Sequence, residues 1–363
     1  MEQITVLLGS GSRTYTIQVG TGLLAEAGRA CARLGLGRRA MVVTQRAVAT
    51  HAAVVADGLR GAGFEPTFHE VPDGEAAKSL AQAQTLWDAF VDQRLDRTSP
   101  VVAVGGGVVG DLAGFAAATY MRGMPLVQVP TTLLAQVDAA IGGKVAVNHP
   151  KAKNLIGAFH QPRLVLIDPA TLGSLPEREY RSGLAEVVKT GAALNADLFA
   201  QLERSIDALG RREGGLLTGV ITTCGREKAA IVEQDAREES GTRMVLNYGH
   251  TVGHALETLG GYRTWLHGEA VAIGLAAAAR LGERLGLSDA GTRGRQITLL
   301  EALGLPVRFS GPSPSEVHEA LRRDKKARDG QVPFVLLKRL GHAEVCFDVP
   351  PETLRAVLEE IHG

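Results

Sequence analysis

The sequence has few cysteines and no continuous hydrophobic stretch long enough to cross a membrane. Its three cysteines, Cys31, Cys224 and Cys346, are far apart and odd in number. This spacing excludes a CxxC zinc site, argues against a disulfide framework and favours a reducing compartment. The apolar stretches are interrupted by Gly, Thr or charged residues, which argues against a membrane span. No secretory signal precedes the first predicted strand, so we expect a cytoplasmic protein.

Net charge is also absent. The 39 Lys and Arg residues balance 39 Asp and Glu residues, and the basic residues are scattered along the chain. Neither nucleic acid nor an anionic membrane surface is therefore expected as a partner. Hydrophobic residues make up 45% of the 363 positions. A chain of this length and composition can bury a large core and is expected to form two domains.

The first half of the chain has the pattern of an α/β domain. Glu2–Leu8 and Thr14–Val19 predict a β-hairpin around Gly9–Ser12. Short Val-, Ile- and Leu-rich strands then alternate with helices, as in a parallel sheet covered on both faces. We therefore expect a Rossmann-like parallel-sheet domain over residues 1–172. Its predicted strands are Arg39–Thr44, Thr67–Val71, Val101–Val104, Leu126–Val129 and Leu164–Ile167, and its predicted helices are Leu23–Leu34, Val48–Gly61 and Ala76–Gln93.

The second half predicts a mostly α-helical domain over residues 173–363. Asp168–Pro176, which is bounded by prolines, is the expected junction. Only Pro333–Leu337 and Ala343–Phe347 have an extended pattern. The predicted helices are Glu177–Leu194, Leu198–Leu209, Leu216–Gln234, Gly249–Leu259, Glu269–Leu285, Gly291–Leu303, Pro314–Arg323 and Pro351–Ile361.

A glycine turn after one buried strand is a candidate phosphate site. Gly105, Gly107 and Gly110 match GxGxxG, but they follow several strands instead of opening the first βαβ unit. A strand–Gly–helix junction presents backbone N–H groups and a positive dipole end to an anion. Tight packing of helix on sheet is the alternative. Thr131 and Thr132 open the next helix at the same expected edge, where they could cap it or contact a ligand.

A basic, glycine-rich segment follows at Gly142–Gly157, and we interpret it as a loop. Lysines in a loop are usually solvated surface residues. This segment has few acidic residues to offset its charge, so it is also a candidate site for a phosphorylated or carboxylated substrate. Its polar residues are Lys144, Asn148, Lys151, Lys153 and Asn154.

Three histidines predict a metal site. His250 and His254 are four residues apart, so on a helix they share one face. Gly249 and Gly253 flank them and leave room for another backbone, a metal or a ligand. His267 follows shortly, just before an apolar helix. Histidines in such glycine-flanked settings favour a functional role over a purely structural one.

Glu186 is the predicted third ligand. It lies among Gly, Leu, Ala and Val, where a carboxylate is costly unless it is paired or bound to a metal. With His250 and His267 it would form a carboxylate–His₂ set that leaves a position open for substrate. His254 is then either a fourth ligand or an acid/base. Lys189, one turn after Glu186, could form a salt bridge with it.

Two further residues point to a cavity near these histidines. Arg243 and Asn247 are one turn apart and could face the same space. The HxxxH pair has no Glu after its first histidine, so the metalloprotease motif is absent and a peptidase is not expected.

Taken in order, these motifs resemble the 3-dehydroquinate synthase family along nearly the whole chain. The resemblance implies a phosphorus–oxygen lyase of the shikimate pathway, which converts 3-deoxy-D-arabino-heptulosonate 7-phosphate to 3-dehydroquinate and phosphate. It also implies transient oxidation by NAD, phosphate elimination, re-reduction and intramolecular aldol closure, with one Zn or Co ion. The matching stretches are Gly74–Ser79, Gly105–Asp111, Pro130–Asp138, Gly142–Lys144, Asn148–Pro150, Lys153–Gly157, Gly183–Lys189, Leu246–Glu257 and His267–Glu269.

The resemblance also implies roles for individual residues. The metal ligands would be Glu186, His250 and His267. The NAD contacts would be Asp73, Glu75, Lys78, Gly106, Gly107, Val108, Asp111, Thr131, Thr132, Lys144, Lys153, Thr171, Leu172, Gly173 and Ser174. The substrate contacts would be Arg122, Asp138, Lys144, Lys153, Asn154, Lys189, Lys228, Arg243, Asn247, His254, Lys325 and Lys326.

Within this substrate set, the resemblance implies catalytic roles for His254, Lys189, Lys144, Asn154, Arg243 and Asn247, with His254 handling protons. It further implies a homodimer in which Arg122 reaches the neighbouring site.

Some positions depart from the family pattern. Ala139, Ala140 and Val145 stand where hydroxyl residues are common, and Gln45 stands where Asp or Asn is frequent. The segment that begins at Asp235 carries one extra residue. Three alternatives stay open: another sugar-phosphate cyclase, a metal-dependent NAD polyol dehydrogenase, and a non-catalytic sugar-phosphate sensor.

Overall fold

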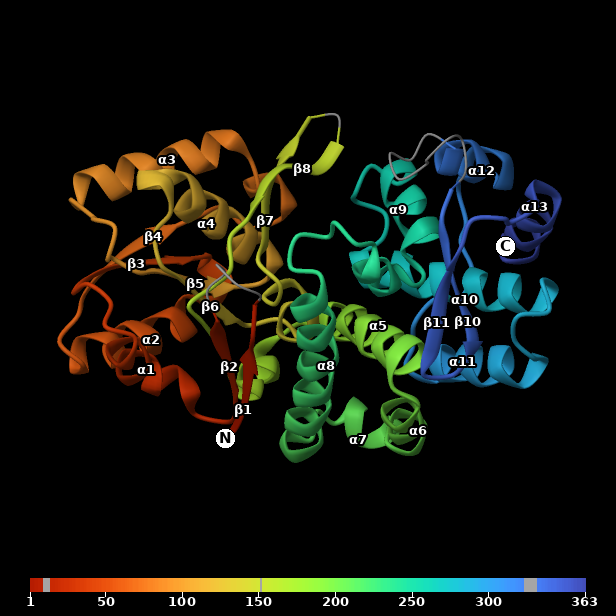
Figure 1. The fold of residues 1–363 in the computed structure, drawn as a ribbon, viewed down its shortest axis with the longest axis horizontal. Coiled ribbons are helices and arrows are strands. Elements are labelled where there is room, and N and C mark those ends of the chain that lie inside the picture. The colour runs from red at the N-terminus through yellow and green to blue at the C-terminus, as the bar shows by residue number, and fades with distance from the viewer. Residues whose placement is uncertain (9–13, 151, 323–331) are drawn as a thin grey trace. The chain divides into compact units, whose positions relative to one another are not determined.

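The computed structural model describes residues 1–8, 14–150, 152–322 and 332–363. The chain divides into two compact units (Figure 1). Unit 1 comprises Met1–Leu175 and Leu217–Arg237, and unit 2 comprises Pro176–Leu216 and Glu238–Gly363. Most of helix α8 (Gly214–Gln234) therefore belongs to unit 1 although it follows the first helices of unit 2 in sequence.

Unit 1 is built on a seven-stranded sheet with the strand order β1-β2-β9-β6-β5-β3-β4. Neighbouring strands are parallel except for β1 and β2, which form the predicted antiparallel pair. The turn predicted between them lies outside the described residues. The predicted strands are confirmed within a few residues at their ends. The strands are β1 (Glu2–Val6), β2 (Tyr15–Val19), β3 (Arg39–Thr44), β4 (Glu65–Glu70), β5 (Val101–Gly105), β6 (Leu126–Pro130) and β9 (Leu164–Ile167).

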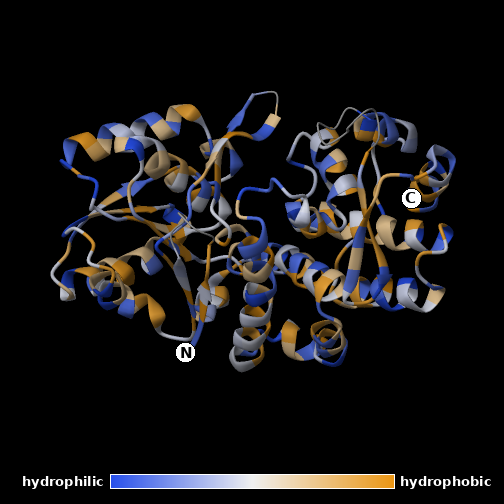
Figure 2. Cartoon of the chain, in the orientation of Figure 1, coloured by the Kyte–Doolittle hydropathy of each residue, from blue (hydrophilic) through white to orange (hydrophobic). Residues whose placement is uncertain are grey.

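Helices cover both faces of this sheet because its central strands are apolar on both sides. Along β5, Val102 and Val104 join the core under α1 (Ala27–Arg33) and α2 (Ala49–Gly61). The alternate residues Val101 and Ala103 join the core under α3 (Leu80–Asp92) and α4 (Gly107–Thr119) (Figure 1). Hydrophilic and hydrophobic residues alternate along α3, which buries one face (Figure 2).

The interpretation of residues 142–157 as a loop was wrong. Most of this segment forms an antiparallel hairpin of β7 (Lys144–His149) and β8 (Ala152–Phe159). Val145 and Val147 are buried in the core that includes α3 and α4. The period-two pattern of β7 was present in the sequence, but the glycines and lysines around it obscured that pattern. Lys151 lies outside the described residues.

Unit 2 is mostly helical, as predicted, with one antiparallel pair formed by β10 (Phe334–Arg339) and β11 (His342–Cys346). Helix α10 packs against α5, α9, α11, α13 and β10. The single helix predicted over Leu198–Leu209 is divided at Ser205. The helices are α5 (Glu177–Leu194), α6 (Ala196–Arg204), α7 (Ile206–Gly210), α9 (His250–Leu259), α10 (His267–Arg284), α11 (Ala290–Ala302), α12 (Pro314–Arg322) and α13 (Pro351–Glu360).

No helix in the described part of the chain combines the length and the hydropathy needed to cross a membrane.

Candidate metal and cofactor sites

Three helices of unit 2 bring together the predicted metal ligands. Glu186 lies in the second half of α5, whereas His250 and His267 are the first residues of α9 and α10. One ligand atom from each residue lies within 4.8 Å of the other two. Glu186 Oε1 is 3.5 Å from His250 Nε2 and 3.4 Å from His267 Nε2. The carboxylate and the two imidazoles therefore face one point.

Glycines allow these helices to approach each other closely. A Cβ on Gly268 would lie 1.8 Å from the Ser182 carbonyl oxygen of α5. A Cβ on Gly274 would lie 1.8 Å from the Gly249 oxygen, and one on Gly253 would lie 3.1 Å from the Ala270 oxygen. The sequence left open whether Gly249 and Gly253 make room for another backbone, a metal or a ligand. In the structure both glycines face the backbone of α10.

Burial and neighbouring charges set the protonation of the triad. Burial would raise the pKa of Glu186, but Lys189, with Nζ 2.5 Å from Oε2, and the two histidines hold that pKa well below its usual range. Burial holds the pKa of His250 well below 6.5. Burial would lower the pKa of His267 as well, but bonds to Glu186 and Glu257 outweigh it and raise that pKa to about 10.

The triad fits a divalent cation of the zinc or cobalt type. Glu186 is 1% exposed, and within the described residues no donor meets either carboxylate oxygen with full hydrogen-bond geometry, although the Lys189 ammonium pairs with Oε2. Lys189 offsets the charge at Oε2, whereas Oε1 faces the two imidazoles, and a cation held between them would stabilise this buried oxygen. His250 Nδ1 is 3.2 Å from the Tyr248 carbonyl oxygen. Because that oxygen can only accept, Nδ1 carries the proton and Nε2 presents its lone pair to a metal.

His254 lies beside the triad but does not belong to the ligand cluster found among the described residues. Its ring centroid is 5.3 Å from that of His250 and 6.3 Å from that of His267. Its absence from that cluster favours the acid/base alternative over that of a fourth ligand. Arg243 and Asn247 lie on the short helix η7 (Thr242–Asn247), where Arg243 is buried and Asn247 is half-buried.

In unit 1, the glycine turn and the threonines lie side by side at the carboxyl edge of the sheet. Gly105 ends β5 and pairs with Pro130 of β6, and the Thr131 N–H donates to the Gly105 oxygen at 3.0 Å. A Cβ on Gly110 would lie 2.7 Å from Gln128 Oε1, so this glycine serves the packing of helix on sheet. Gly106, Gly107 and Val108 are at the N-terminus of α4, whose first N–H groups have no partner within the helix.

The two threonines differ in their surroundings. Thr132 Oγ1 accepts from the Ala135 N–H at 3.2 Å, which is a capping bond. Thr131 is 2% exposed, and its hydroxyl has no hydrogen-bond partner within the described residues. A buried hydroxyl of this kind is available to a ligand.

Gln136 was not predicted from the sequence. Its amide donates to the Pro130 oxygen, the Asp168 oxygen and Thr171 Oγ1 at 3.0–3.2 Å. It thereby joins the Thr131 segment to the helix η6 (Pro169–Ser174), which carries the predicted residues Thr171, Leu172, Gly173 and Ser174. No sequence pattern marks this role. Two of the three acceptors are backbone oxygens, which any residue type offers, and Asp168 and Thr171 are more than thirty residues away from Gln136.

A polar network holds the remaining predicted cofactor residues. Lys78 Nζ forms an ion pair with Asp111 of α4 and donates to Asn154 Oδ1 at 2.5 Å. Burial raises the pKa of Asp111, and the charge of Lys78 opposes this rise. Glu75 lies on the short helix η3 (Glu75–Ala77), with Lys153 Nζ 3.6 Å from its Oε1. Asp73 is exposed just before this turn.

Asn148 connects the two parts of this network. Its amide nitrogen donates to Glu75 Oε1 at 2.7 Å, and its amide oxygen accepts from the Asn154 N–H at 3.1 Å. Asn154 has φ +57°, a left-handed conformation that is uncommon outside glycine. The sequence pointed to Asn148 only as one polar residue of a basic segment.

The other predicted substrate residues are placed as follows. Lys228 on α8 donates to Asp138 Oδ1 at 2.8 Å and to the Asp138 carbonyl oxygen at 2.6 Å. Lys144 is exposed at the start of β7. Arg122 is exposed, with φ +65°. Lys325 and Lys326 lie outside the described residues.

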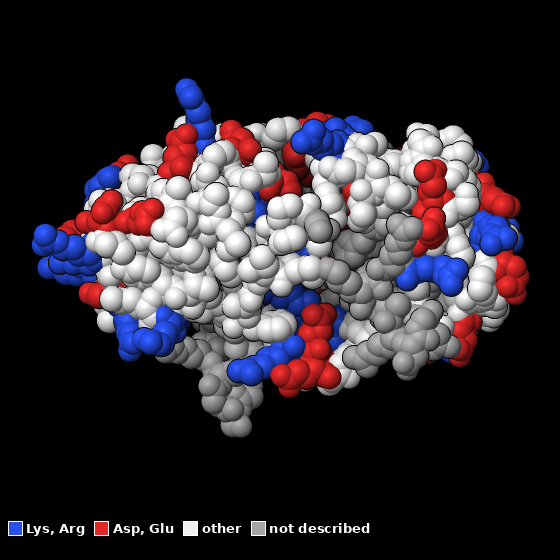
Figure 3. Space-filling view, turned by 90° about the horizontal axis from the view of Figure 1, so that it is seen from above, with Lys and Arg blue, Asp and Glu red and all other residues white. Residues whose placement is uncertain are grey.

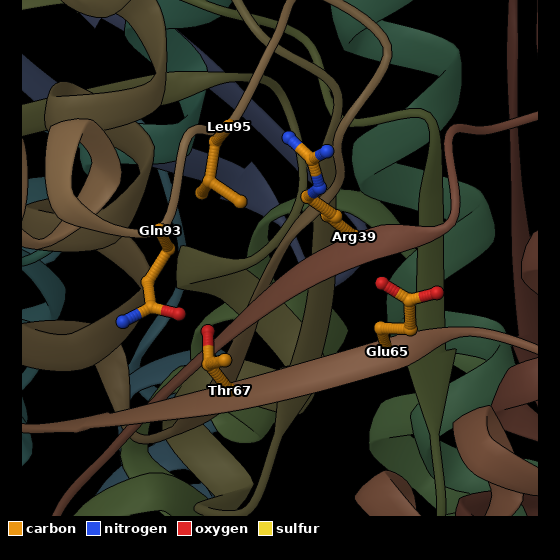
Figure 4. A pocket seen from close by; sticks show the side chains of 5 residues that line it. All are labelled: Arg39, Glu65, Thr67, Gln93 and Leu95. Carbon is orange, nitrogen blue, oxygen red and sulfur yellow. The ribbon is translucent and has the colours of Figure 1, made fainter.

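A cavity of about 170 Å³ is lined by Arg39, Glu65, Thr67, Gln93 and Leu95 (Figure 4). Arg39 and Glu65 begin β3 and β4, so this cavity lies at the amino ends of the strands, opposite to the glycine turn. It is smaller than a usual ligand site. On the face shown in Figure 3, acidic and basic side chains form small separate groups, and no broad field of one sign is present there.

Comparisons with known proteins cover almost the whole chain. Residues 68–182 match the family model described as 3-dehydroquinate synthase N-terminal, and residues 183–327 match the one described as 3-dehydroquinate synthase C-terminal. The chain is 54% identical over 342 residues to 3-dehydroquinate synthase of Geobacter metallireducens, covering 94% of each chain. It is 46% identical to that of Desulforamulus reducens, covering 98% of this chain and 99% of the other.

A solved structure is similar as well. This is 2-epi-5-epi-valiolone synthase from Streptomyces hygroscopicus subsp. jinggangensis 5008, with NAD+ and Zn2+ bound. It is 30% identical to this chain, the TM-score is 0.89, and the match covers 98% of each chain.

Proposed function

The chain belongs to the 3-dehydroquinate synthase family, and we propose that it catalyses this family's reaction with NAD held by unit 1 and a divalent cation held by unit 2. The substrate is 3-deoxy-D-arabino-heptulosonate 7-phosphate, and the products are 3-dehydroquinate and phosphate. The enzyme is a phosphate-eliminating lyase of the shikimate pathway. The observation that carries this proposal is the convergence of Glu186, His250 and His267 within 4.8 Å, in a chain that matches the family along its length.

When bound, NAD supplies a reversible hydride acceptor, and the cation stabilises negative charge that develops on substrate oxygens. The protein supplies position and charge around them. Glu186 and the Nε2 atoms of His250 and His267 would hold the cation, because these atoms already face one point. His254, beside this cluster, would take or return a proton through a ring nitrogen.

Unit 1 would hold NAD at the carboxyl edge of its sheet. The first turn of α4 offers N–H groups to the pyrophosphate, and the Thr131 hydroxyl is buried and available to a ligand. Glu75 has a carboxylate that can accept from sugar hydroxyls. The other NAD contacts that we propose are Asp73, Lys78, Gly106, Gly107, Val108, Asp111, Thr132, Lys144, Lys153 and Thr171–Ser174.

Cationic and amide side chains would bind the anionic substrate. Lys189 and Arg243 provide positive charge in unit 2, and Lys144, Lys153 and Lys228 provide it in unit 1. Asp138, Asn154 and Asn247 complete the described set, and Lys325 and Lys326 are assigned to it by family resemblance alone.

The decisive experiment measures phosphate released from the named substrate with purified protein and NAD, before and after treatment with a chelator. A 3-dehydroquinate synthase releases phosphate without net formation of NADH, and chelation stops this release. A polyol dehydrogenase would accumulate NADH, whereas a sugar-phosphate sensor would bind the substrate and release no phosphate. Another cyclase would instead prefer a different sugar phosphate in a parallel panel. Any of these three results would contradict the proposal.

We also propose a cytoplasmic homodimer in which Arg122 reaches the partner's site. The support is local: Met121 and Arg122 are exposed in a left-handed turn, and the nearby strand β8 exposes Phe159. Arg122→Ala should weaken substrate binding while the protein stays dimeric by light scattering. If wild-type protein is monomeric and fully active, this proposal fails and the enzyme assignment stands.

A further inference from the structure

A second carboxylate of unit 2, that of Glu257, lies behind the metal triad. Glu257 is on α9, seven residues after His250 and three after His254, so all three lie on one face of the helix. Its Oε2 is 3.1 Å from His267 Nδ1. The side chain is only 5% exposed. A buried carboxylate facing an imidazole needs an explanation, since burial of its charge is costly.

The His267 ring lies between two carboxylates. Nε2 faces Glu186 Oε1 at 3.4 Å, whereas Nδ1 faces Glu257 Oε2 at 3.1 Å. An ionised carboxylate can only accept a hydrogen bond. In the metal-binding form Nδ1 therefore keeps its proton and donates it to Glu257, and the lone pair of Nε2 is directed toward Glu186 and the cation. Glu257 contacts the nitrogen that points away from the triad, so its contact is with a ligand and not with the cation.

The two histidine ligands are oriented by different means. His250 Nδ1 meets a backbone carbonyl, that of Tyr248, which no substitution removes. His267 Nδ1 meets a side chain, which a substitution can remove. A carboxylate also makes the imidazole more basic than a carbonyl does, which strengthens its bond to a metal.

We infer that Glu257 is a positioning residue that fixes the tautomer and orientation of His267 for the cation. This inference deepens the proposed function and rests on it. Sequence reasoning assigned Glu257 no role, because its partner His267 belongs to another helix, ten residues further on.

Metal affinity of the metal-free protein tests this role without reference to activity. Zn²⁺ would be titrated in competition with a chromophoric chelator for wild type, Glu257→Ala and Glu257→Gln. Loss of the partner of a metal-bound histidine typically weakens metal binding by about 10- to 100-fold. We expect a loss of this size for Glu257→Ala. Glu257→Gln keeps an acceptor oxygen but not the charge, so its affinity should fall between those of wild type and the alanine variant.

Glu360→Gln is the matched control. Glu360 Oε1 is 2.8 Å from Arg280 Nε, so this substitution also removes a carboxylate charge that braces α10. Arg280 is thirteen residues along α10 from His267, about 20 Å at the helical rise. We expect this variant to bind Zn²⁺ within about twofold of wild type, a change of about 0.4 kcal/mol. Thermal unfolding of each metal-free variant reports whether it is folded. If Glu257→Ala does not fold, Glu257→Gln, whose side chain is nearly equal in shape to glutamate, takes its place in the test.

Two results would overturn the inference. One is a folded Glu257→Ala variant that binds Zn²⁺ as tightly as wild type. If only Glu257→Gln folds, the same result in that variant counts instead. The other is an equal loss in Glu360→Gln, which would indicate general loosening of α10. Failure of wild-type protein to bind one Zn²⁺ would be a different result, since it would refute the metal assignment of the proposed function itself.

Discussion

Gly268→Ala should disconnect His267 from the metal site without unfolding the protein. Gly268 directly follows His267 at the start of α10 and faces the Ser182 carbonyl oxygen of α5. Ser182 lies one turn before Glu186 on that helix. The substitution therefore acts at the contact that sets the separation between two ligand-bearing helices.

The structure supplies the magnitude. An added Cβ would lie 1.8 Å from the Ser182 oxygen and 2.5 Å from its carbonyl carbon. Carbon–oxygen contacts in proteins are about 3.3 Å or longer, so α10 and α5 must separate locally by about 1.5 Å. Metal–ligand distances tolerate only about 0.2 Å. We expect Zn²⁺ affinity to fall by about 100-fold or more, since this change displaces a ligand itself and not its hydrogen-bond partner. Overpacking of this kind costs about 1–3 kcal/mol of stability.

Gly294→Ala provides the control for this experiment. Gly294 lies within α11 of the same unit, and a Cβ there would meet nothing within 4 Å. Alanine in a helix interior is favoured over glycine by about 0.5–1 kcal/mol, so this variant should be slightly more stable and bind Zn²⁺ normally. The assays are chelator competition for Zn²⁺ and urea unfolding of the metal-free proteins. Wild-type Zn²⁺ affinity in a folded Gly268→Ala variant would refute the argument that this contact sets the ligand geometry.

Three further outcomes are expected. His250→Ala should lose stoichiometric Zn²⁺ binding. His254→Ala should keep its Zn²⁺ affinity within about threefold of wild type but lose turnover by about 10²–10⁴-fold. Loss of Zn²⁺ binding in His254→Ala would indicate that His254 is a ligand. Because the pKa of His267 is raised to about 10, its imidazole is protonated near neutral pH and must release that proton when the cation binds, so the apparent Zn²⁺ affinity should rise about tenfold per pH unit from about pH 7 to 9. Calorimetry in buffers of different protonation enthalpy should find about one proton released, and a pH-independent affinity would contradict this. Asn148→Ala removes hydrogen bonds to Glu75 and Asn154 worth about 0.5–1.5 kcal/mol each, so the Kd for NAD and the KM for the sugar phosphate should each rise about 2- to 10-fold. Asn148→Asp keeps the acceptor for the Asn154 N–H, so it should raise the KM less than the Kd. A change below twofold in both constants for Asn148→Ala would contradict the bridging role of Asn148.

Much of the fold followed from local patterns in the sequence. The buried strands β3, β5, β6 and β9 are short apolar runs, and the long helices of unit 2 have the 3.6-residue period over many turns. The metal triad was also predictable. Glu186 is a charged residue in an apolar helix, and His250 and His267 stand beside glycines. Residue types that are costly in their local setting point to a function wherever they occur.

Tertiary structure decided what depends on partners that are distant in sequence. The β7–β8 hairpin is stable because Val145 and Val147 bury against α3 and α4, and the period-two pattern of β7 alone could not identify these packing partners. Gly249 and Gly253 turned out to admit the backbone of α10. Asn148 and Gln136 acquire their roles only where several chain segments meet.

The clearest division is at His267. The sequence predicts it as a ligand, because the residue type and its setting carry that information. The direction of its ring could not, since that depends on Glu257 approaching from another helix and on Gly268 letting α10 rest against α5. A sequence determines which groups are available for chemistry, and packing determines the angle and distance at which they meet.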